Sequence, residues 1–196
     1  MRQLGWLEYY ASPKQNLRRS SQMKTYCFLF LIALSITQVN AETSIAILDF
    51  ELNDLTLKPG TAAELNRTAS IKPLLEKELK SAGYRIISID LAMQQKANSG
   101  FGYLFDHNDV ATELGKTAGA DYVLIGRLHK PSFLFAYIMG HLIRTKDGQL
   151  IGNYISETKG GDEKLTLKGV ESMADKIDKD LDNRYTPPPP KHTTLH

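Results

Sequence analysis

The stretch AGADYVLIG, residues 118–126, decides the fold. Before it, Val110, Ala111 and Leu114 repeat at helical spacing, and Gly119 supplies the left-handed backbone that closes a helix. Residues 120–126 then form a mostly apolar run of strand length. A helix that passes directly into a buried strand is typical of an α/β domain.

Two earlier segments extend the same pattern towards the N-terminus. Residues 45–50, IAILDF, are apolar at nearly every position, which predicts a central strand with both faces covered. Residues 84–90 predict a second strand, and residues 120–126 a third. Because helical segments separate these three runs, we expect parallel pairing through right-handed crossovers.

The helix between the first two strands has clear end signals. Thr61 and Glu64 have the spacing of a capping box, and Gly83 marks the C-terminal end. Pro73 leaves two alternatives open: a kinked helix, or a second helix that Ser70 caps with Pro73 in its first turn. In either case the residues expected to face inward are Leu65, Ala69, Leu75 and Leu79.

A hairpin and a final helix complete the predicted domain. Asp147-Gly148 separates the apolar runs 133–143 and 149–156, which is a strong hairpin signal. Residues 165–181 repeat apolar side chains at steps of three and four, as in an amphipathic helix. The sequence therefore predicts a single three-layer α/β domain with a mixed five-stranded sheet, three parallel strands followed by an antiparallel hairpin, and helices packed on it.

The N-terminal residues predict export. Residues 26–39 are largely apolar but too short for a comfortable membrane span, and they end shortly before Ala41, so they resemble a signal peptide. We expect translation to start at Met23 and cleavage to follow Ala41. The predicted parts are a leader and signal peptide (1–41), the α/β domain (42–184) and a proline-rich disordered tail (185–196). The mature protein would be periplasmic, without a stable membrane anchor.

Charge and cysteine content exclude several kinds of partner and site. The whole chain has 196 residues, 24 basic and 22 acidic, but the leader holds five of the basic residues and one acidic residue. The predicted mature chain, with 19 basic and 21 acidic residues, therefore has no basic excess for nucleic acid. The only cysteine of the whole chain, Cys27, leaves with the leader, so neither disulfides nor thiolate sites are expected in the mature protein.

Three acidic residues are candidates for a binding site at the carboxyl ends of the predicted parallel strands. Asp49 and Glu51 follow the first strand and Asp90 ends the second, and ligands of open α/β sheets bind at this edge. Such carboxylates could hold a cation or act as acid and base, but the more common role of Asp there is to cap helices and loops. The sequence has no catalytic motif, so we predict no catalytic residues, no metal and no cofactor.

Aromatic residues mark two further candidate surfaces. Phe101, Tyr103 and Phe105 alternate within residues 100–107, beside two glycines. They either form a lip or docking surface, which is our preferred partner contact, or fold over the sheet as additional core. Residues 133–139, FLFAYIM, lack polar alternation, so this strand is either covered on both faces, the favoured alternative, or exposes an apolar face.

The order of elements, the stretch 118–126 and the hairpin before a terminal helix resemble known envelope proteins. They are similar to the N-terminal domain of TolB, to the curli secretion lipoprotein CsgG, to lipoprotein activators of penicillin-binding proteins and to a bacterial secreted family of unknown function. The resemblance spans about residues 44–181. It implies an exported, non-enzymatic adaptor or assembly factor whose partner is another periplasmic or outer-membrane protein. The alternative is a periplasmic small-molecule or metal-binding domain, accessory to a periplasmic enzyme or transport system.

Overall fold

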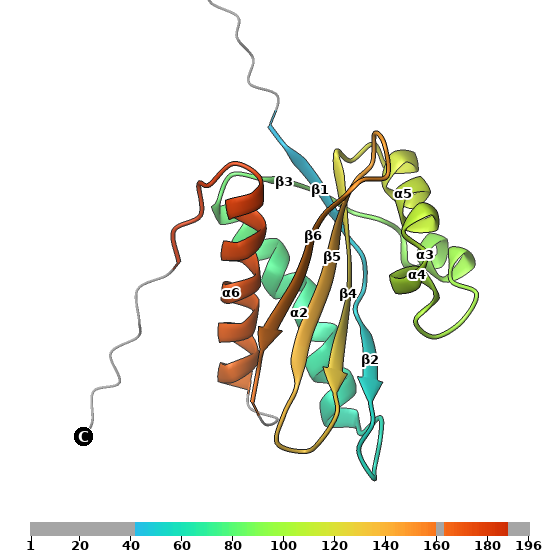
Figure 1. Cartoon of the computed structure of the whole chain (residues 1–196), viewed down its shortest axis with the longest axis vertical. Helices are drawn as coiled ribbons and strands as arrows, with labels where there is room; N and C mark the ends of the chain where they lie inside the picture. The colour runs from blue at the N-terminus through green and yellow to red at the C-terminus, as the bar shows by residue number, and fades with distance from the viewer. Residues whose placement is uncertain (1–41, 160–162, 188–196) are drawn as a thin grey trace, which may run out of the picture. The chain divides into compact units, whose positions relative to one another are not determined.

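A six-stranded mixed sheet lies between two layers of helices in the computed structural model, which describes residues 42–159 and 163–187 (Figure 1). The strand order is β3-β1-β4-β5-β6, and β2 also pairs with β4. The three-layer α/β prediction is confirmed. The strands are β1 (Ser44–Ile47), β2 (Glu51–Asp54), β3 (Arg85–Ile87), β4 (Tyr122–Lys130), β5 (Tyr137–Arg144) and β6 (Leu150–Glu157).

Strand directions follow the predicted pattern. β1 pairs in parallel with β3 on one side and with β4 on the other, whereas β4, β5 and β6 are successively antiparallel. Every residue of β1 is buried, because helices cover both of its faces.

The sheet has six strands instead of the predicted five because the first strand is interrupted. Ile47 lies opposite Leu124, but Glu51 lies opposite Arg127, so three residues on one strand face two on its neighbour. This bulge ends β1, after which the chain pairs with β4 again as β2. The ring of Phe50 fills the space over Gly126, where an added Cβ would come within 2.1 Å of it.

Helices cover the two faces of the sheet unequally. On one face, α2 (Ala62–Ser81) and α6 (Glu163–Asp180) pack over a core that includes Leu124, Leu142 and Ile177. On the other, α3 (Leu91–Ala97), α4 (Tyr103–Asp106) and α5 (Asn108–Thr117) gather near the end of the sheet where β4 begins (Figure 1). None of the helices in the described residues is long and apolar enough to cross a membrane.

The helix α2 settles the alternatives at Pro73, because it runs through this residue without a second start. Thr61 caps it as predicted, with its hydroxyl accepting a hydrogen bond from the Glu64 amide at 3.3 Å. The predicted inward face is wrong in its first half: Leu65 is 53% exposed and Ala69 is also exposed. Polar side chains are buried there instead, namely Glu64, Arg67 and Thr68.

The C-terminal part of the described chain is tied to the core. Tyr84 donates a hydrogen bond from its hydroxyl to the buried carboxylate of Asp178 at 2.5 Å, and the Tyr185 amide donates to the same carboxylate at 2.6 Å. The Tyr185 hydroxyl in turn donates to Glu78 at 3.0 Å. The predicted leader and cleavage site (1–41) and the rest of the predicted tail (188–196) lie outside the described residues.

Candidate interaction site

Two of the predicted acidic residues have structural partners of their own. The Asp49 carboxylate accepts a hydrogen bond from Lys72 Nζ at 3.2 Å, and its backbone amide and carbonyl both pair with the side chain of Gln94, at 2.9 and 3.0 Å. Asp90 caps α3 by accepting from the Ala92 amide at 2.9 Å. The two carboxylates therefore have separate partners, and each holds local structure.

Glu51 holds the aromatic loop in place. Its Oε1 accepts a hydrogen bond from Asn98 Nδ2 at 2.8 Å, and its Oε2 accepts from the backbone amide of Gly102 at 2.7 Å. Gly102 has a φ of 77°, a left-handed conformation that favours glycine. We call residues 98–106 the latched loop, because a half-buried carboxylate on β2 fixes its middle.

The three predicted aromatic residues of this loop have different environments. Phe105 is buried, with its ring centroid 4.0 Å from that of His141 and 3.5 Å from the guanidinium carbon of Arg127. Tyr103 stacks on His107 with centroids 4.0 Å apart. Phe101 is 65% exposed. The loop is thus additional core at Phe105 and an accessible surface at Phe101, so each alternative holds for part of it.

Arg127 and His141 form a small polar cluster beside Phe105 that sequence reasoning missed. Arg127 pairs with Asp106 at 3.3 Å. Burial and the positive charge of Arg127 both lower the pKa of His141, so its imidazole is mainly neutral at pH 7. Arg127 Nε and His141 Nδ1 are buried without a hydrogen-bond partner in the part of the chain that the structure describes.

The lower half of this sheet face has no helix over it (Figure 1). We call it the open face. Cross-strand partners share a face, so Met139 and Ile155 lie in one row with Arg127, and Tyr137 lies in the next row with His129. Ile155 is 49% exposed, and the others are half-buried. The residues of the open face are Asn53, His129, Tyr137, Met139, Ile155 and Glu157, the last being the exposed cross-strand partner of Tyr137.

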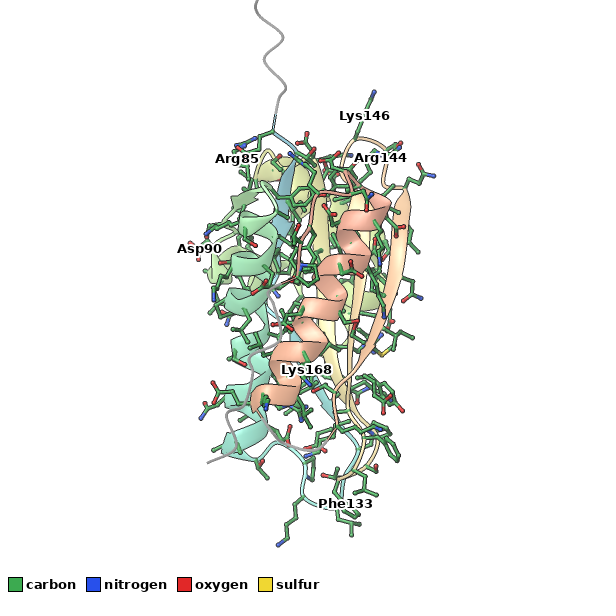
Figure 2. The ribbon with its side chains drawn as sticks, turned by 90° about the vertical axis from the view of Figure 1, so that its left-hand side faces the viewer. Arg85, Asp90, Phe133, Arg144, Lys146 and Lys168 are labelled. Carbon is green, nitrogen blue, oxygen red and sulfur yellow. The ribbon has the colours of Figure 1, made fainter. Side chains whose placement is uncertain are left out.

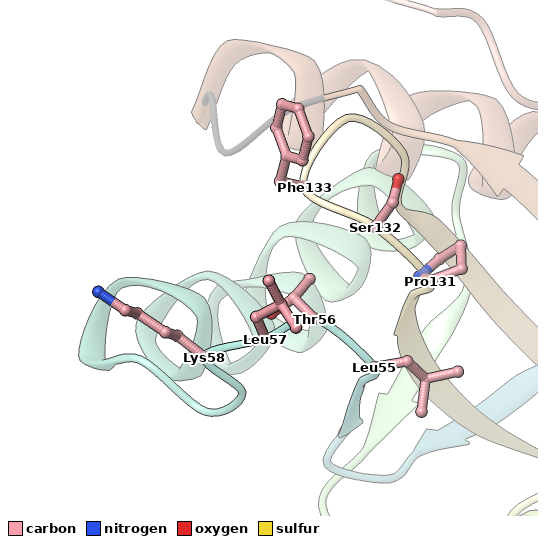
Figure 3. Close-up of a pocket in the computed structure, with 7 residues that line it drawn as sticks. All are labelled: Leu55, Thr56, Leu57, Lys58, Pro131, Ser132 and Phe133. Atoms are coloured by element: carbon pink, nitrogen blue, oxygen red, sulfur yellow. The ribbon is translucent and has the colours of Figure 1, made fainter.

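Exposed apolar side chains gather at the end of the sheet beyond the open face. They come from two loops, 55–60 after β2 and 131–136 between β4 and β5, which face each other across a cleft of about 500 Å³ (Figure 3). Figure 2 shows Phe133 at this end, with Arg85, Arg144 and Lys146 at the other. We call this group the apolar tip: Leu55, Leu57, Phe133, Leu134 and Phe135.

The apolar tip corrects one sequence prediction. Residues 133–139 were expected to form a strand, with both faces covered as the favoured alternative. β5 begins only at Tyr137, and Phe133 is 75% exposed in the preceding loop. Pro131 cannot donate a backbone hydrogen bond, so the ladder ends before it.

A buried ionic network lies at the base of these loops. Lys130, the last residue of β4, places its ammonium 2.5 Å from Glu64 on α2, and Arg67 lies 3.4 Å from the other oxygen of the same carboxylate. Arg67 also donates to the hydroxyls of Thr158 and Thr166, at 2.8 Å each. The network joins the start of α2, the end of β4 and the start of α6.

Within residues 42–159 and 163–187, no three His, Cys, Asp or Glu side chains are grouped so that they could hold a metal ion. The predicted site residues therefore divide into structural carboxylates and a latched loop with one exposed ring, and the open face and the apolar tip are additional surfaces formed by other residues.

Comparisons with known proteins give a family and a set of similar folds. The model of a family described as a protein of unknown function (DUF2380) matches residues 43–177. No curated protein matches the chain. The C-terminal domain of LpoB from Salmonella enterica is 19% identical, with 66% of this chain and 91% of that chain covered and a TM-score of 0.43.

Two further solved structures are similar at the same level. TolB from Acinetobacter baumannii is 18% identical, with 73% of this chain but only 29% of that chain covered, at a TM-score of 0.46. Lipoprotein GNA1162 from Neisseria meningitidis is 16% identical, with 71% and 99% covered, at a TM-score of 0.43. TolB and a lipoprotein are thus among the similar structures, and the predicted resemblance to CsgG stays a prediction.

Proposed function

The chain belongs to the DUF3280 family, described as a protein of unknown function, and we propose that it is an exported, non-enzymatic adaptor or assembly factor of the cell envelope. On this proposal it binds another periplasmic or outer-membrane protein. One observation carries it: a half-exposed sheet face, beside a loop held rigid by Glu51, that no described helix covers.

The open face has the composition of a protein interface. Tyr and Met, which interfaces favour, stand at its centre as Tyr137 and Met139, and Arg127 borders it. Exposed Ile155 and the exposed ring of Phe101 add apolar contact at its margins. Because the apolar residues are partly desolvated already, a partner that covers them gains apolar burial, and the carboxylate that it must pair or leave in solvent is that of Glu157.

The latched loop favours binding through its rigidity. Ordering a mobile loop on binding costs conformational entropy, which reduces affinity. Here Glu51 fixes Asn98 and Gly102 before any partner arrives, and Phe105 anchors the far end of the loop in the core. Phe101 is therefore presented in a set position.

The acidic candidates each have a structural role. Asp49, Glu51 and Asp90 each accept hydrogen bonds from neighbouring protein groups, and none of them is paired with another carboxylate in the described hydrogen bonds. Export itself is inferred from the predicted signal peptide before Ala41.

Site-specific crosslinking in the native envelope tests this function. A photoreactive amino acid is placed at Ile155, at Phe101 and, as a matched control, at exposed Lys77 on α2 in the opposite helical layer. We expect one crosslinked partner from the first two positions and none from Lys77. The intact mass of the recovered protein should place its N-terminus at Glu42. Equal crosslinking from all three positions, or none from Ile155 and Phe101, would contradict the proposal.

A second candidate function, the binding of a small polar ligand, has one observation in its favour. Among the described residues, Arg127 Nε and His141 Nδ1 are buried without hydrogen-bond partners beside Phe105, and a ligand that gained access with an acceptor and a donor would satisfy both. Under this alternative, a compound that raises the melting temperature of the wild-type protein should lose its effect on an Arg127→Met variant but keep it on Arg144→Met.

A further inference from the structure

The apolar tip exposes large apolar side chains at positions where the fold does not need them. Leu57 is fully exposed, Phe133 is 75% exposed and Leu55 is 63% exposed. All belong to loops beyond the strand ends, where polar residues would serve as well, and nothing in the described residues covers them. Contiguous exposed apolar groups of this kind on a soluble domain mark an interaction surface.

The two loops differ chemically from the open face. Residues 55–57 and 131–136 contain no charged side chain. Lys58 follows directly, and no ion pair to it occurs among the described residues. The nearby Asp54 carboxylate is used within its own loop, accepting from the amides of Thr56 at 3.0 Å and Gly60 at 3.1 Å. The tip is thus an uncharged apolar group bordered by Lys58, which forms no ion pair within the described residues.

The area and shape of the tip favour a lipid bilayer over a protein as its binding partner. Its five side chains present on the order of 500 Å². A stable protein interface takes about 800 Å² from each partner, usually on a broad, complementary surface. A loop tip with a fully exposed leucine can instead enter a bilayer, where no matching surface is needed.

The base of the tip is rigid enough to hold the loops during insertion. Lys130 and Glu64 form an ion pair at the start of the 131–136 loop, and the Leu55 amide donates to the carbonyl of Lys130 at 2.9 Å. Both loops therefore leave from the same fixed point. Lys58 has a long aliphatic stem, which lets its ammonium stay at headgroup level while neighbouring side chains go deeper.

We propose that the apolar tip inserts into the surface of a lipid bilayer that carries anionic headgroups, with Leu57 and Phe133 entering the apolar layer and Lys58 contacting the headgroups. The end that bears Arg85, Arg144 and Lys146 then faces away from the bilayer (Figure 2). The open face runs along the strands between these two ends, so it remains accessible to a protein partner. Membrane contact and partner binding are therefore separable.

Vesicle sedimentation tests this inference with the exported protein. The vesicles contain phosphatidylethanolamine with a quarter phosphatidylglycerol, and a parallel set contains only phosphatidylcholine. The test variant is Leu57→Ser/Phe133→Ser, and the matched control is Leu150→Ser, a comparably placed exposed leucine at the other end of the sheet. The wild type and all variants carry the same N-terminal residues, so the ratio of their partition coefficients isolates the contribution of the tip.

We expect the double variant to lose at least about tenfold in the partition coefficient and Leu150→Ser to keep the wild-type value. Lys58→Gln should weaken binding about fivefold on the anionic vesicles and leave it unchanged on phosphatidylcholine. In a Phe133→Trp variant, fluorescence should shift to the blue and be quenched by brominated lipid.

Three results would overturn the inference. One is a wild-type protein that stays in the supernatant at excess lipid, and another is equal binding by the double variant. The third is a double variant that keeps its vesicle binding but loses self-association or its crosslinked protein partner, which would assign the tip to a protein interface. If Ile155 gives no crosslinked partner, the proposal that the open face binds a protein fails. The vesicle result, which tests the apolar tip, does not depend on that outcome.

Discussion

Replacing Glu51 by alanine should release the latched loop without unfolding the domain. The carboxylate accepts two hydrogen bonds, from Asn98 Nδ2 at 2.8 Å and from the Gly102 amide at 2.7 Å. Alanine removes both acceptors, while the core contacts of Phe105 with His141 and Arg127 remain. The Gly102 amide and Asn98 Nδ2 then lose their acceptor on β2, and only hydrogen bonds within the loop remain around them.

The size of the effect follows from the strength of hydrogen bonds to a charged acceptor. Each contributes about 1.5–3 kcal/mol, and the half-buried position of Glu51 favours the lower value. Two bonds give about 3 kcal/mol for opening of the loop, or about a hundredfold in the opening equilibrium. The global free energy of unfolding should fall by less, because the loop can open locally.

Hydrogen exchange of the Gly102 amide measures this opening directly. We expect exchange to become about a hundredfold faster in Glu51→Ala and about tenfold faster in Asn98→Ala, which removes one bond. Glu51→Gln should lie between the wild type and Glu51→Ala. Glu113→Gln, which changes an exposed carboxylate on α5, is the matched control and should leave the amide unchanged. Unaltered protection of Gly102 in Glu51→Ala would refute the latch.

Three further predictions concern the framework that positions these surfaces. Glu64→Gln should cost about 3–5 kcal/mol in urea unfolding, because it leaves the buried guanidinium of Arg67 and the mostly buried ammonium of Lys130 without their carboxylate, and Lys130→Met in the same background should recover part of the loss. Burial opposes ionisation of Asp178, but backbone and tyrosine hydrogen bonds outweigh it and lower its pKa below 3.8. Its contribution to stability should therefore be complete at pH 7 and disappear as the pH falls below about 4, so urea midpoints should depend less on acid pH in Asp178→Asn. Gly126→Ala should lower stability by about 1–3 kcal/mol, because the new Cβ meets the ring of Phe50, and a smaller residue at position 50 should reduce that loss.

The fold could be predicted where its elements have a clear hydrophobic period. α6 buries Val170, Ala174 and Ile177 as its steps of three and four indicate, and the three parallel strands pair as the order of elements requires. The sixth strand could not be predicted from the sequence. It arises from the bulge after Ile47, and this bulge depends on how Phe50 fits over Gly126, a residue 76 positions away in the chain.

The first half of α2 shows where periodicity misleads. Leu65 fits an apolar stripe but is exposed, whereas Glu64 and Arg67 are buried. Their burial is favourable only because Lys130 and Thr166 meet them from other elements. Such partners cannot be identified from one helix alone.

Sequence reasoning named residues of the candidate site but not how they are joined. It gave Glu51 and the loop with Phe101 as separate candidate contacts, and the hydrogen bond from the Gly102 amide to Glu51 joins them. It gave an exposed apolar face at residues 133–139 only as the less favoured alternative and placed it in a strand, because Phe133–Phe135 continues without a break into the apolar residues of β5. The proline at position 131 was the available signal that the ladder ends there.

Binding of the crosslinked partner to purified protein tests the central claim most directly. Isothermal titration would compare the wild type with Ile155→Asp, which puts a charge at the centre of the exposed edge of the open face, and with Lys77→Ala as control. We predict stoichiometric binding by the wild type and the control, and at least about tenfold weaker binding by Ile155→Asp, because a desolvated unpaired charge is costly. Equal affinity of all three proteins would contradict the assignment of the open face as the partner-binding surface.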